Sequence, residues 1–389
     1  MPASNVPARH DITLADWRVH PNTHFSFQNV SEFVPTARIA EPAGAEASVT
    51  SPGLIGSLQV SHEGRKHSLA DHLAATHADA FAILRDGQFL DEWRAPHFAP
   101  AKPHIIFSIS KSVTGLLAGI AVGDGKLDVE KRVAHYVPEI AGSTFESATV
   151  RHLLDMTVDL DFEENYLDRH GAFNRYRRAT LWNPQDPGTE PETMLEFFAS
   201  LRAKGGGHGK TFFYASPNSD LLGIVVERAT GMRLHEFMAT HLWQPMGAKG
   251  AAEVTVDRIG TARAAGGISV TLRDLARMGE LVMRNGRAAD GAQIVPADWI
   301  ADMFSNGDRQ AWIDGNFYNA MPGGRYRSCW YDVLDGRGSF YGVGIHEQWL
   351  WCDPTSRVVL AKFSSRPEPS DEACTIREIA ALSEIARQF

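Results

Sequence analysis

The first clear pattern of hydrophobic and polar positions is that of a β-hairpin. Residues 80–84 are apolar, and residues 89–93 alternate between apolar and polar side chains. Between the two runs lies Asp86-Gly87, a dipeptide that favours tight turns between antiparallel strands.

The middle of the chain, from about residue 107 to 282, has mainly helical periodicity. A run of apolar and small residues at 112–122 predicts a buried helix. Gly231 follows a further helical pattern, as glycine does at many helix C-termini. The pattern predicts helices at 112–122, 192–201, 218–230, 234–243 and 272–283, and another that begins at 150–154.

The tail changes to extended patterns. Residues 341–351 and 357–364 predict strands joined by a turn at Asp353-Pro354, and residues 373–388 predict an amphipathic helix. Because strands lie near both ends and helices lie between them, the simplest fold is α+β. We expect an antiparallel sheet built from both termini, flanked by helices, with an all-helical domain inserted. The predicted domains are residues 1–105 (N-terminal part of the sheet domain), 106–284 (helical) and 285–389 (C-terminal part of the sheet domain).

Residues 1–77 are rich in Pro, Ala, Ser and His, and their periodicity is weak. We expect an extended leader with short elements. Histidines recur at 62, 67, 72 and 77. A step of five residues turns a helix by about 500°, so these side chains do not share a face, and we expect no metal site there.

Composition and charge narrow the function classes. The chain has 389 residues, of which 43% are hydrophobic and 22% charged, enough for a large core. Its net charge is -9. A nucleic-acid-binding protein needs a basic face to neutralise phosphates, so we expect no nucleic-acid partner. The same charge disfavours attachment to anionic membranes.

The cysteines and the N-terminus indicate a compartment. Cys329, Cys352 and Cys374 are few, odd in number and without metal-ligand spacing, which is typical of reduced thiols. The first residues lack the apolar core of a signal peptide. The longest apolar run is far shorter than the roughly 20 residues that cross a bilayer. We expect a cytoplasmic protein without membrane association.

A glycine-rich segment at 205–211 resembles a phosphate-binding loop. However, Lys204 occupies the position of the first glycine that such a loop requires. The order of elements is also reversed, because a helix precedes the segment and a strand, at 211–214, is predicted to follow it. We expect no nucleotide there.

An acidic run offers a second candidate ligand site. It lacks the central glycine that bends a calcium-binding loop, so a solvated helix end or loop is the expected structure. The run consists of Asp159, Asp161, Glu163 and Glu164.

The most informative segment is FSISKSVTG at 107–115, which contains Ser-x-x-Lys. If Ser108 opens a helix, Lys111 lies one turn later on the same face. An alcohol is a poor nucleophile near neutral pH unless a base or cation activates it. Lys111 can serve in either way, and burial would lower its pKa. The helix N-terminus also suits an oxyanion. A surface serine and lysine on an ordinary helix is the alternative.

A second segment, FFYASPNSDLLG at 212–223, strengthens this interpretation. A tyrosine beside a lysine ammonium can lose its proton more easily and act as a general base, which makes Tyr214 a candidate. Ser216 could hydrogen-bond Lys111 or substrate. The alternative is a core tyrosine whose hydroxyl caps a turn.

Four segments in this order resemble the penicillin-recognising serine hydrolases: class C β-lactamases, DD-peptidases and family VIII carboxylesterases. They are FSISKSVTG, YASPNSDLLGIVVERATG, PMGA at 245–248 and GGISVTLRDLARMG at 266–279. The match covers roughly residues 78–389. Two further segments, DMTVDLDFEENYLD and GVGIHEQ, resemble one branch, the 6-aminohexanoate-dimer hydrolases, which cleave linear nylon-6 oligomers.

The resemblance implies a β-lactamase/transpeptidase-like fold and catalytic roles by position. Ser108 would be the acylated nucleophile, Lys111 would assist proton transfer, and Tyr214 would be general base and acid. The backbone N–H groups of Ser108 and Ile345 would hold the oxyanion. The resemblance implies no cofactor or metal, and it makes a homodimer the expected assembly.

It also implies substrate-binding residues. Tyr166 would close over the substrate and hydrogen-bond its amide, and Trp182 would lie beside that pocket. Packing aromatics in the helical domain are the alternative for both. Ser216, Gly344 and His346 complete the predicted substrate-binding set.

Two departures limit the resemblance. The Lys-Thr-Gly motif of β-lactamases is replaced by Gly344-Ile345-His346, so the lysine that would hold a β-lactam carboxylate is absent. We therefore expect weak β-lactamase or DD-peptidase activity. The loop after Tyr166 is rich in arginines, which repel an ammonium and attract a carboxylate. This favours substrates with a neutral or anionic end over the dimer. The arginines are Arg169, Arg175, Arg177 and Arg178.

Together the motifs predict a serine hydrolase that cleaves small amides or esters through an acyl-enzyme. Three alternatives stay open: a β-lactamase or DD-peptidase-like enzyme, an acyltransferase that uses an alcohol or amine in place of water, and a binding protein that is acylated without turnover.

Overall fold

The structure is a computed structural model that describes residues 7–44, 46–62, 64–166, 168 and 170–389. Residues 1–6 of the expected leader therefore lie outside the described residues.

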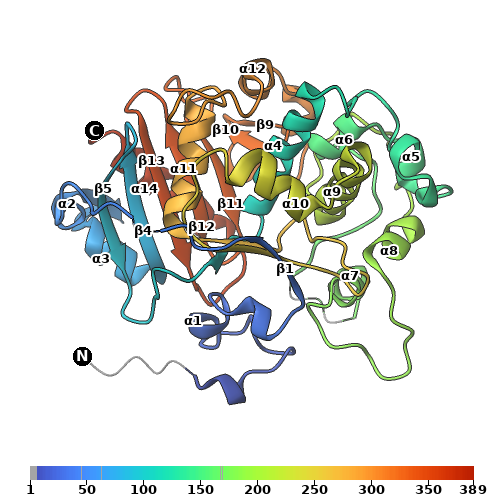
Figure 1. The fold of residues 1–389 in the computed structure, drawn as a ribbon, viewed down its shortest axis with the longest axis horizontal. Coiled ribbons are helices and arrows are strands. Elements are labelled where there is room, and N and C mark those ends of the chain that lie inside the picture. Colours follow the sequence, from blue (N-terminus) through green and yellow to red (C-terminus); the bar gives the residue numbers. More distant parts are fainter. Residues whose placement is uncertain (1–6, 45, 63, 167, 169) are drawn as a thin grey trace.

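The largest element is a seven-stranded antiparallel sheet with the strand order β5-β4-β13-β12-β11-β10-β9. Two strands come from the N-terminal part of the chain and five from the C-terminal part (Figure 1). The prediction of a sheet built from both ends is confirmed. The strands are β4 Ala78–Arg85, β5 Gln88–Arg94, β9 Arg325–Arg327, β10 Trp330–Asp332, β11 Phe340–Gly344, β12 Gln348–Asp353 and β13 Val358–Ser364.

Tight turns set the register of this sheet. Asp86 and Gly87 join β4 to β5 with φ of 51° and 80°, as a turn matched to the strand twist requires. The single strand predicted at 341–351 is wrong, because the structure has β11 and β12 there, paired from Phe340 to Gly344. His346 and Glu347 have positive φ and reverse the chain. No glycine marks this turn, which hid it from the sequence pattern.

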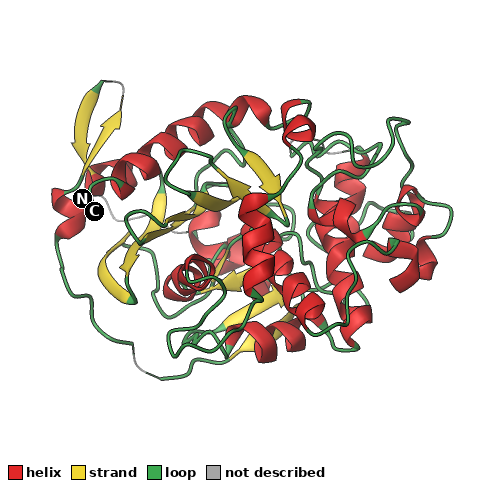
Figure 2. Ribbon diagram, turned by 90° about the horizontal axis from the view of Figure 1, so that it is seen from above, coloured by secondary structure: helices red, strands yellow, loops and turns green. Residues whose placement is uncertain are grey.

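Helices cover both faces of the sheet (Figure 2). Gly279 of α11 (Leu272–Met283) lies so close to one face that a Cβ there would meet Val359 Cγ1 at 2.8 Å. On the other face, Glu378 of α14 (Glu372–Ala386) pairs with Lys362 at 2.7 Å. Val359 and Lys362 are an odd number of residues apart on β13, so they point to opposite faces.

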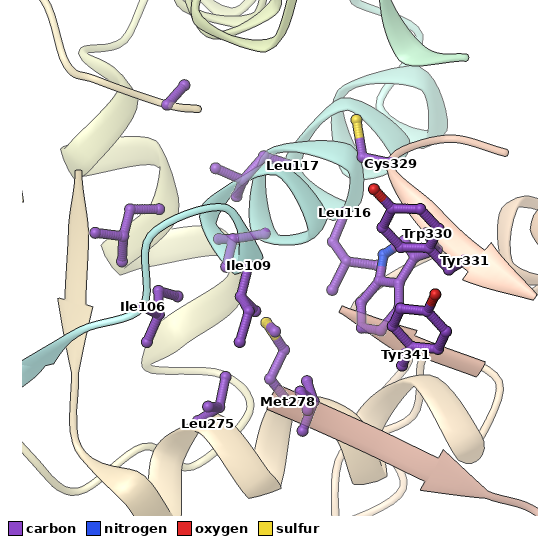
Figure 3. Packing of buried hydrophobic residues seen from close by; sticks show 14 of the residues in the cluster. Ile106, Ile109, Leu116, Leu117, Leu275, Met278, Cys329, Trp330, Tyr331 and Tyr341 are labelled. Carbon is purple, nitrogen blue, oxygen red and sulfur yellow. The ribbon is translucent and has the colours of Figure 1, made fainter. Parts of the chain in front are cut away.

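A buried helix, α4 (Ile109–Gly123), connects the sheet to the helical part. It contacts β10, β11 and β12 on one side and α9 (Ser216–Thr230) on another. Figure 3 shows Leu116 beside Trp330 and Tyr331, and Ile109 beside Met278 of α11. The apolar run in the sequence therefore marks the central helix of the molecule.

We predicted that the range 106–284 is all-helical, but it also contains strands. It contains β7 (Ala252–Thr255) and β8 (Ile268–Val270), which join a second sheet in the order β1-β7-β8-β6. Strands this short show too little alternation to be recognised. No strand forms at 211–214, because Phe212 N–H bonds Ala311 O and Phe213 N–H bonds Met156 O.

Among the remaining elements, the helices lie close to the predicted ranges wherever the sequence predicted a helix. The remaining elements are α1 Thr23–Ser26, β1 Thr36–Ala40, α2 Leu54–Ser57, β2 Gln59–His62, β3 Arg65–Ser68, α3 Leu69–Ala75, β6 His104–Ile105, α5 Val133–Tyr136, α6 Val150–Leu154, α7 Ala172–Ala179, α8 Met194–Ser200, α10 Leu234–Met238, a π-helix at Ala239–Trp243, α12 Ala297–Ser305 and α13 Arg309–Ile313, with short 3-10 turns between them.

The N-terminal segment is anchored by a buried apolar cluster of its own. Trp17 packs edge-on against Trp182 with ring centroids 5.3 Å apart, and Phe27 packs against Phe107 at 5.0 Å. This cluster also contains Val30 and is separate from the main core. The described part of the expected leader has short elements, as predicted, and its first part packs against Phe107.

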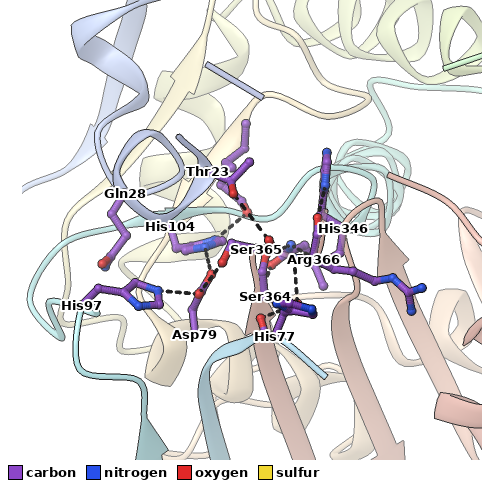
Figure 4. Close-up of polar contacts among 12 residues, drawn as sticks. Thr23, Gln28, His77, Asp79, His97, His104, His346, Ser364, Ser365 and Arg366 are labelled. Atoms are coloured by element: carbon purple, nitrogen blue, oxygen red, sulfur yellow. Dashed lines mark hydrogen bonds and ion pairs between the residues drawn. The ribbon is translucent and has the colours of Figure 1, made fainter. Parts of the chain in front are cut away.

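Asp79, at the start of β4, links three segments of the chain (Figure 4). Its carboxylate accepts hydrogen bonds from His97 Nε2 at 2.7 Å, His104 Nε2 at 3.1 Å and Ser365 Oγ at 2.7 Å. Burial alone would raise the pKa of Asp79, but the hydrogen bonds from His104 and His97 lower it well below its usual value. The ionised carboxylate therefore stabilises the fold.

No helix among the described residues combines the length and apolar character that crossing a membrane requires.

We predict that Asp79→Asn lowers the free energy of unfolding at pH 7 by about 2 kcal/mol, because an amide cannot accept these bonds as an anion does. The depressed pKa means that this stability is complete above about pH 5 and is lost as the pH falls below about 4. Chemical denaturation measures it. Asp124→Asn, at the exposed end of α4, is the matched control and should change stability by less than about 0.5 kcal/mol. Equal effects of the two variants would contradict the prediction.

Candidate active site

Ser108, Lys111 and Tyr214 meet at the start of α4. Ser108 occupies the N-cap position of the helix, and its Oγ accepts a hydrogen bond from the Tyr214 hydroxyl at 2.7 Å. Lys111 Nζ lies 2.9 Å from the same Oγ. The structure thus brings together the three residues that the two sequence motifs predicted.

The backbone before Ser108 is held in an unusual conformation. Phe107 has a φ of 45°, in the left-handed region that a bulky residue rarely adopts. Its ring is fixed by edge contacts with Phe27 and Trp182, at 5.0 and 6.0 Å between centroids. Such strain persists only where packing determines the conformation. Packing on both sides therefore fixes the turn that presents Ser108.

Lys111 is almost completely buried, with 2% of its surface exposed. Besides Ser108, its Nζ donates to Ser216 Oγ at 3.0 Å and to Ala265 O at 2.8 Å. Burial lowers the pKa of Lys111 to about 8, against the opposing effect of the Glu164 and Asp220 carboxylates. The expected direction of this shift is confirmed, and a large share of Lys111 is neutral near pH 8.

The pKa of Tyr214 is shifted in the direction opposite to the one that we expected from the sequence. Burial raises its pKa well above the usual value, whereas we expected the lysine to lower it. Lys111 Nζ lies over the ring, 4.8 Å from its centroid. Phe317 stacks on the ring at 4.9 Å, and Asn316 Oδ1 accepts from Tyr214 N at 3.0 Å. In the resting site Tyr214 is therefore a neutral hydrogen-bond donor.

A hairpin of the large sheet brings Ile345 beside Ser108. Gly344, the last residue of β11, approaches so closely that a Cβ would lie 2.5 Å from Ile106 O and 3.1 Å from Ser108 N. Only glycine permits this approach. The backbone N–H groups of Ser108 and Ile345 donate to no described residue. Two free N–H groups next to a nucleophile are the arrangement that stabilises an oxyanion.

Glu164 is a site residue that the sequence reading missed. Its Oε2 accepts from Ser216 N at 2.7 Å, and its Oε1 accepts from Ser216 Oγ at 2.9 Å and Tyr166 OH at 2.6 Å. The prediction that the whole acidic run is solvated is therefore wrong for Glu164. Asp159 fits the loop interpretation, since it accepts three backbone N–H bonds from the glycine-rich segment. The available sequence signal for Glu164 was that it lies two residues before Tyr166.

A small pocket adjoins Ser108, with Tyr166, Trp182, Ser216 and Ile345 among its lining residues. Trp182 Nε1 donates to Thr255 Oγ1 at 3.1 Å, which fixes the indole. The cavity measures about 20 Å³, close to the room that one water needs. The pocket beside Ser108 is therefore narrow in this conformation.

Two predicted substrate-binding residues lie outside the lining of this pocket. Gly344 acts through its close backbone approach, as described above. His346 is buried behind the pocket, where its Nδ1 lies 2.7 Å from Arg366 O and its ring contacts Phe27 and Phe107. Burial lowers the pKa of His346 to about 4, so the ring is neutral. His346 therefore does not line the pocket in this structure, because the left-handed turn directs its ring inward.

The arginines after Tyr166 separate into two groups. Arg175 pairs with Glu192 at 2.6 Å, and Arg178 pairs with Asp186, so neither faces the pocket. Arg177 lines the pocket, and Arg169 lies outside the described residues.

Two further arginines that no motif indicated, Arg18 and Arg263, line the same pocket. They come from the N-terminal segment and from the stretch before β8, far from Ser108 in sequence.

One group of described residues has donor atoms close enough to consider a metal: His24, Asp79 and His97. The Asp79 carboxylate already accepts three side-chain hydrogen bonds. Burial lowers the pKa of His24 to about 4, and the His24 ring stacks on that of His97 at 4.3 Å. These contacts account for the three residues as part of a structural network of hydrogen bonds and ring stacking.

A model of the beta-lactamase family matches residues 67–384. The 6-aminohexanoate-dimer hydrolase of Paenarthrobacter ureafaciens is 35% identical over 371 residues, which cover 93% of this chain and 92% of that protein.

Solved structures share the fold. A Bacillus anthracis protein assigned as a 6-aminohexanoate-dimer hydrolase has a TM-score of 0.88 at 23% identity, with 98% of each chain covered. EstCE1, a hydrolase with promiscuous acyltransferase activity, has a TM-score of 0.60 at 15% identity and covers 80% of this chain and 96% of its own. At these identities the likeness shows fold alone. The family match and the relative along nearly the whole chain show more: this protein belongs to the beta-lactamase family.

Proposed function

We propose that this protein is a serine hydrolase that cleaves linear amides or esters through an acyl-enzyme on Ser108. The observation that carries the proposal is the position of Ser108 Oγ, 2.7 Å from the Tyr214 hydroxyl and 2.9 Å from the buried Lys111 amine. Two free backbone N–H groups and a pocket adjoin it.

The pKa directions suggest how protons move during acylation. Neutral Lys111 takes the Ser108 proton as Oγ attacks the carbonyl carbon, and the N–H groups of Ser108 and Ile345 hold the oxyanion. The bond to the leaving group then breaks. Tyr214 gives its proton to the leaving nitrogen or oxygen, and its phenolate lies beside the Lys111 ammonium.

Deacylation reverses these roles. The Tyr214 phenolate takes a proton from water, and the resulting hydroxide attacks the acyl carbon. Lys111 returns its proton to Ser108 Oγ as the ester bond breaks. Lys111 is then the base in the first half-reaction and Tyr214 in the second, whereas the family resemblance alone implies Tyr214 as base in both.

The preference for linear substrates rests on two supports. The relative from Paenarthrobacter ureafaciens is named for a linear amide dimer. At the end of β11, Gly344-Ile345-His346 replaces the lysine motif that would hold a β-lactam carboxylate. A side-by-side screen of short-chain esters, the 6-aminohexanoate dimer and a chromogenic β-lactam tests this preference. We expect ester hydrolysis to exceed β-lactam hydrolysis.

Ser108→Ala should abolish hydrolysis of a p-nitrophenyl ester, with a loss of about 10⁴-fold or more in kcat, because no other described hydroxyl has both proton-transfer partners. Ser112→Ala is the matched control on the same helix. Its hydroxyl donates to Cys329 O, so the control should lose about 1 kcal/mol of stability and keep its activity. Activity retained in Ser108→Ala would refute the nucleophile assignment.

Tyr214→Phe should separate the two half-reactions. In the unchanged protein Tyr214 gives its proton to the departing p-nitrophenolate, but this leaving group can also depart without a proton. The variant should therefore still be acylated through Lys111 and release a burst of one equivalent. Deacylation lacks its base and should slow by about 10²-fold or more. Stopped-flow absorbance measures both phases. If the burst disappears together with turnover, Tyr214 is the base in acylation as well.

The pH dependence follows from Lys111. Its neutral form is the active one, so kcat/KM should rise with pH through an apparent pKa near 8 and then level. Lys111→Arg, which cannot become neutral, should lose about 10²- to 10⁴-fold. A rate that falls as the pH rises through 8 would require the ammonium form and would contradict the proposed proton path.

A further inference from the structure

Three guanidinium groups line the pocket that contains Ser108: those of Arg18, Arg177 and Arg263. They lie close enough to affect one another. Burial lowers the pKa of Arg18 well below its usual value, and Arg177 and Arg263 lower it further. Burial lowers the pKa of Arg177 to about 10, again with a contribution from Arg263. Three basic side chains therefore gather in one pocket.

None of the three forms an ion pair with a described carboxylate. Arg18 Nη2 donates to Trp182 O at 3.3 Å and to Asn183 Oδ1, and Arg177 Nη1 donates to Tyr166 O at 3.0 Å. These acceptors are neutral. By contrast, Arg175 on the same helix as Arg177 is paired bidentately with Glu192, at 2.6 Å for both bonds. The charge of the pocket arginines is not offset by direct pairing.

Arg263 gives the strongest indication of a ligand, because only 5% of its surface is exposed. Its Nε and Nη1 have no hydrogen-bond partner among the described residues, and neither has Arg18 Nε. A buried charged donor without a partner is costly unless a ligand satisfies it.

Aromatic rings hold these arginines without neutralising them. The Arg263 guanidinium lies 4.0 Å from the Trp182 ring centroid, and that of Arg18 lies 5.4 Å from the same ring. Arg177 lies 4.4 Å from the Phe173 centroid. Cation–π contacts fix the position of a charge and leave the N–H groups, which lie in the guanidinium plane, available for hydrogen bonds.

Three carboxylates lie near enough to act on these arginines: those of Glu164 and Asp168 on Arg177, and that of Asp220 on Arg263. Both oxygens of Glu164 accept hydrogen bonds from Ser216 and Tyr166. Those of Asp220 accept from Ala265 N at 2.6 Å and from the Tyr176 hydroxyl. Asp168 Oδ1 accepts from two backbone N–H groups of its own loop.

We propose that Arg18, Arg177 and Arg263 form an anion-binding subsite next to Ser108, so that the preferred substrate carries a carboxylate a short distance from its scissile bond. This rests on the proposed serine hydrolase function and names its substrate class. A carboxylate would accept the unused N–H groups and reduce the repulsion among three cations, whereas an ammonium at the same place would add to it.

The test compares p-nitrophenyl esters that differ only in the charge at the far end. The anionic set is the mono-p-nitrophenyl esters of adipic, pimelic and suberic acid, whose chains are long enough to limit cyclisation onto their own carbonyl. Their methyl-capped diesters are the neutral set, and the ester of 6-aminohexanoate is the cation. A second arm, 4-hexanoyloxybenzoate against its methyl ester, places the carboxylate on the leaving group and shows which half of the substrate the subsite binds.

We expect the kcat/KM of at least one anionic ester to exceed that of its neutral counterpart by about tenfold, which corresponds to about 1.4 kcal/mol, and that of the ammonium ester by more. Arg177→Gln should reduce the anion-to-neutral ratio to near one, and Arg177→Glu should move the preference toward the ammonium ester. Arg175→Gln, on the same helix but paired outside the pocket, should leave the ratio unchanged.

A binding measurement separates this subsite from the chemistry. Hexanoate should bind Ser108→Ala, detected by calorimetry, and should bind the Ser108→Ala/Arg177→Gln double variant about tenfold more weakly, while hexylammonium binds neither. Equal hydrolysis of anionic and neutral esters, or a ratio that survives Arg177→Gln, overturns the subsite and leaves the hydrolase intact. No hydrolysis of any ester, with hexanoate still bound, overturns the hydrolase and leaves the subsite.

Discussion

The site depends on keeping one amine out of water. Lys111 is held on the buried face of α4, and its Nζ has three oxygen acceptors: Ser108, Ser216 and the Ala265 carbonyl. Removal from water disfavours the ammonium form, while the nearby Glu164 and Asp220 carboxylates favour it. The balance leaves a pKa of about 8. An amine that is partly neutral near physiological pH can accept a proton from an alcohol, which an exposed lysine cannot do efficiently.

The rest of the fold maintains that balance. The apolar face of α4 is fixed between the large sheet and α9, and Asp220 on α9 holds the Ala265 segment through its N–H. The sheet in turn supplies Ile345, because Gly344 allows the end of β11 to approach Ser108. The nucleophile and the amine come from one region of sequence, the Tyr214 hydroxyl from a second and the Ile345 N–H from a third. Core packing sets the relative positions of these three regions.

Local spacing explains what the sequence could predict. Ser108 and Lys111 share a helix face by geometry, and the β4–β5 hairpin follows from Asp86-Gly87. Tyr214 was found because its motif opens a helix. The family and fold inferred from these motifs agree with the family match and the shared structures.

The features that could not be predicted depend on contacts between residues that are far apart in the sequence. Arg18 and Arg263 carry no motif, and they are brought to the pocket by the N-terminal segment and by the stretch before β8. Glu164 looked like part of a solvated run until Ser216 was placed beside it. The direction of the Tyr214 pKa shift was wrong because burial outweighs the nearby lysine charge. The inward direction of the His346 ring could not be foreseen, because a turn without glycine divides what looked like one strand.

The measurement that tests the central claim most directly is an NMR titration of the Lys111 amine. Kinetic pH profiles report the ionisation of the Lys111–Tyr214 pair, whereas lysine labelled with ¹³C at Cε reports the amine itself, with Lys111→Arg to assign the signal. The account predicts that Lys111 titrates near pH 8 while exposed lysines titrate at about 10.4. A value for Lys111 equal to that of the exposed lysines would contradict it.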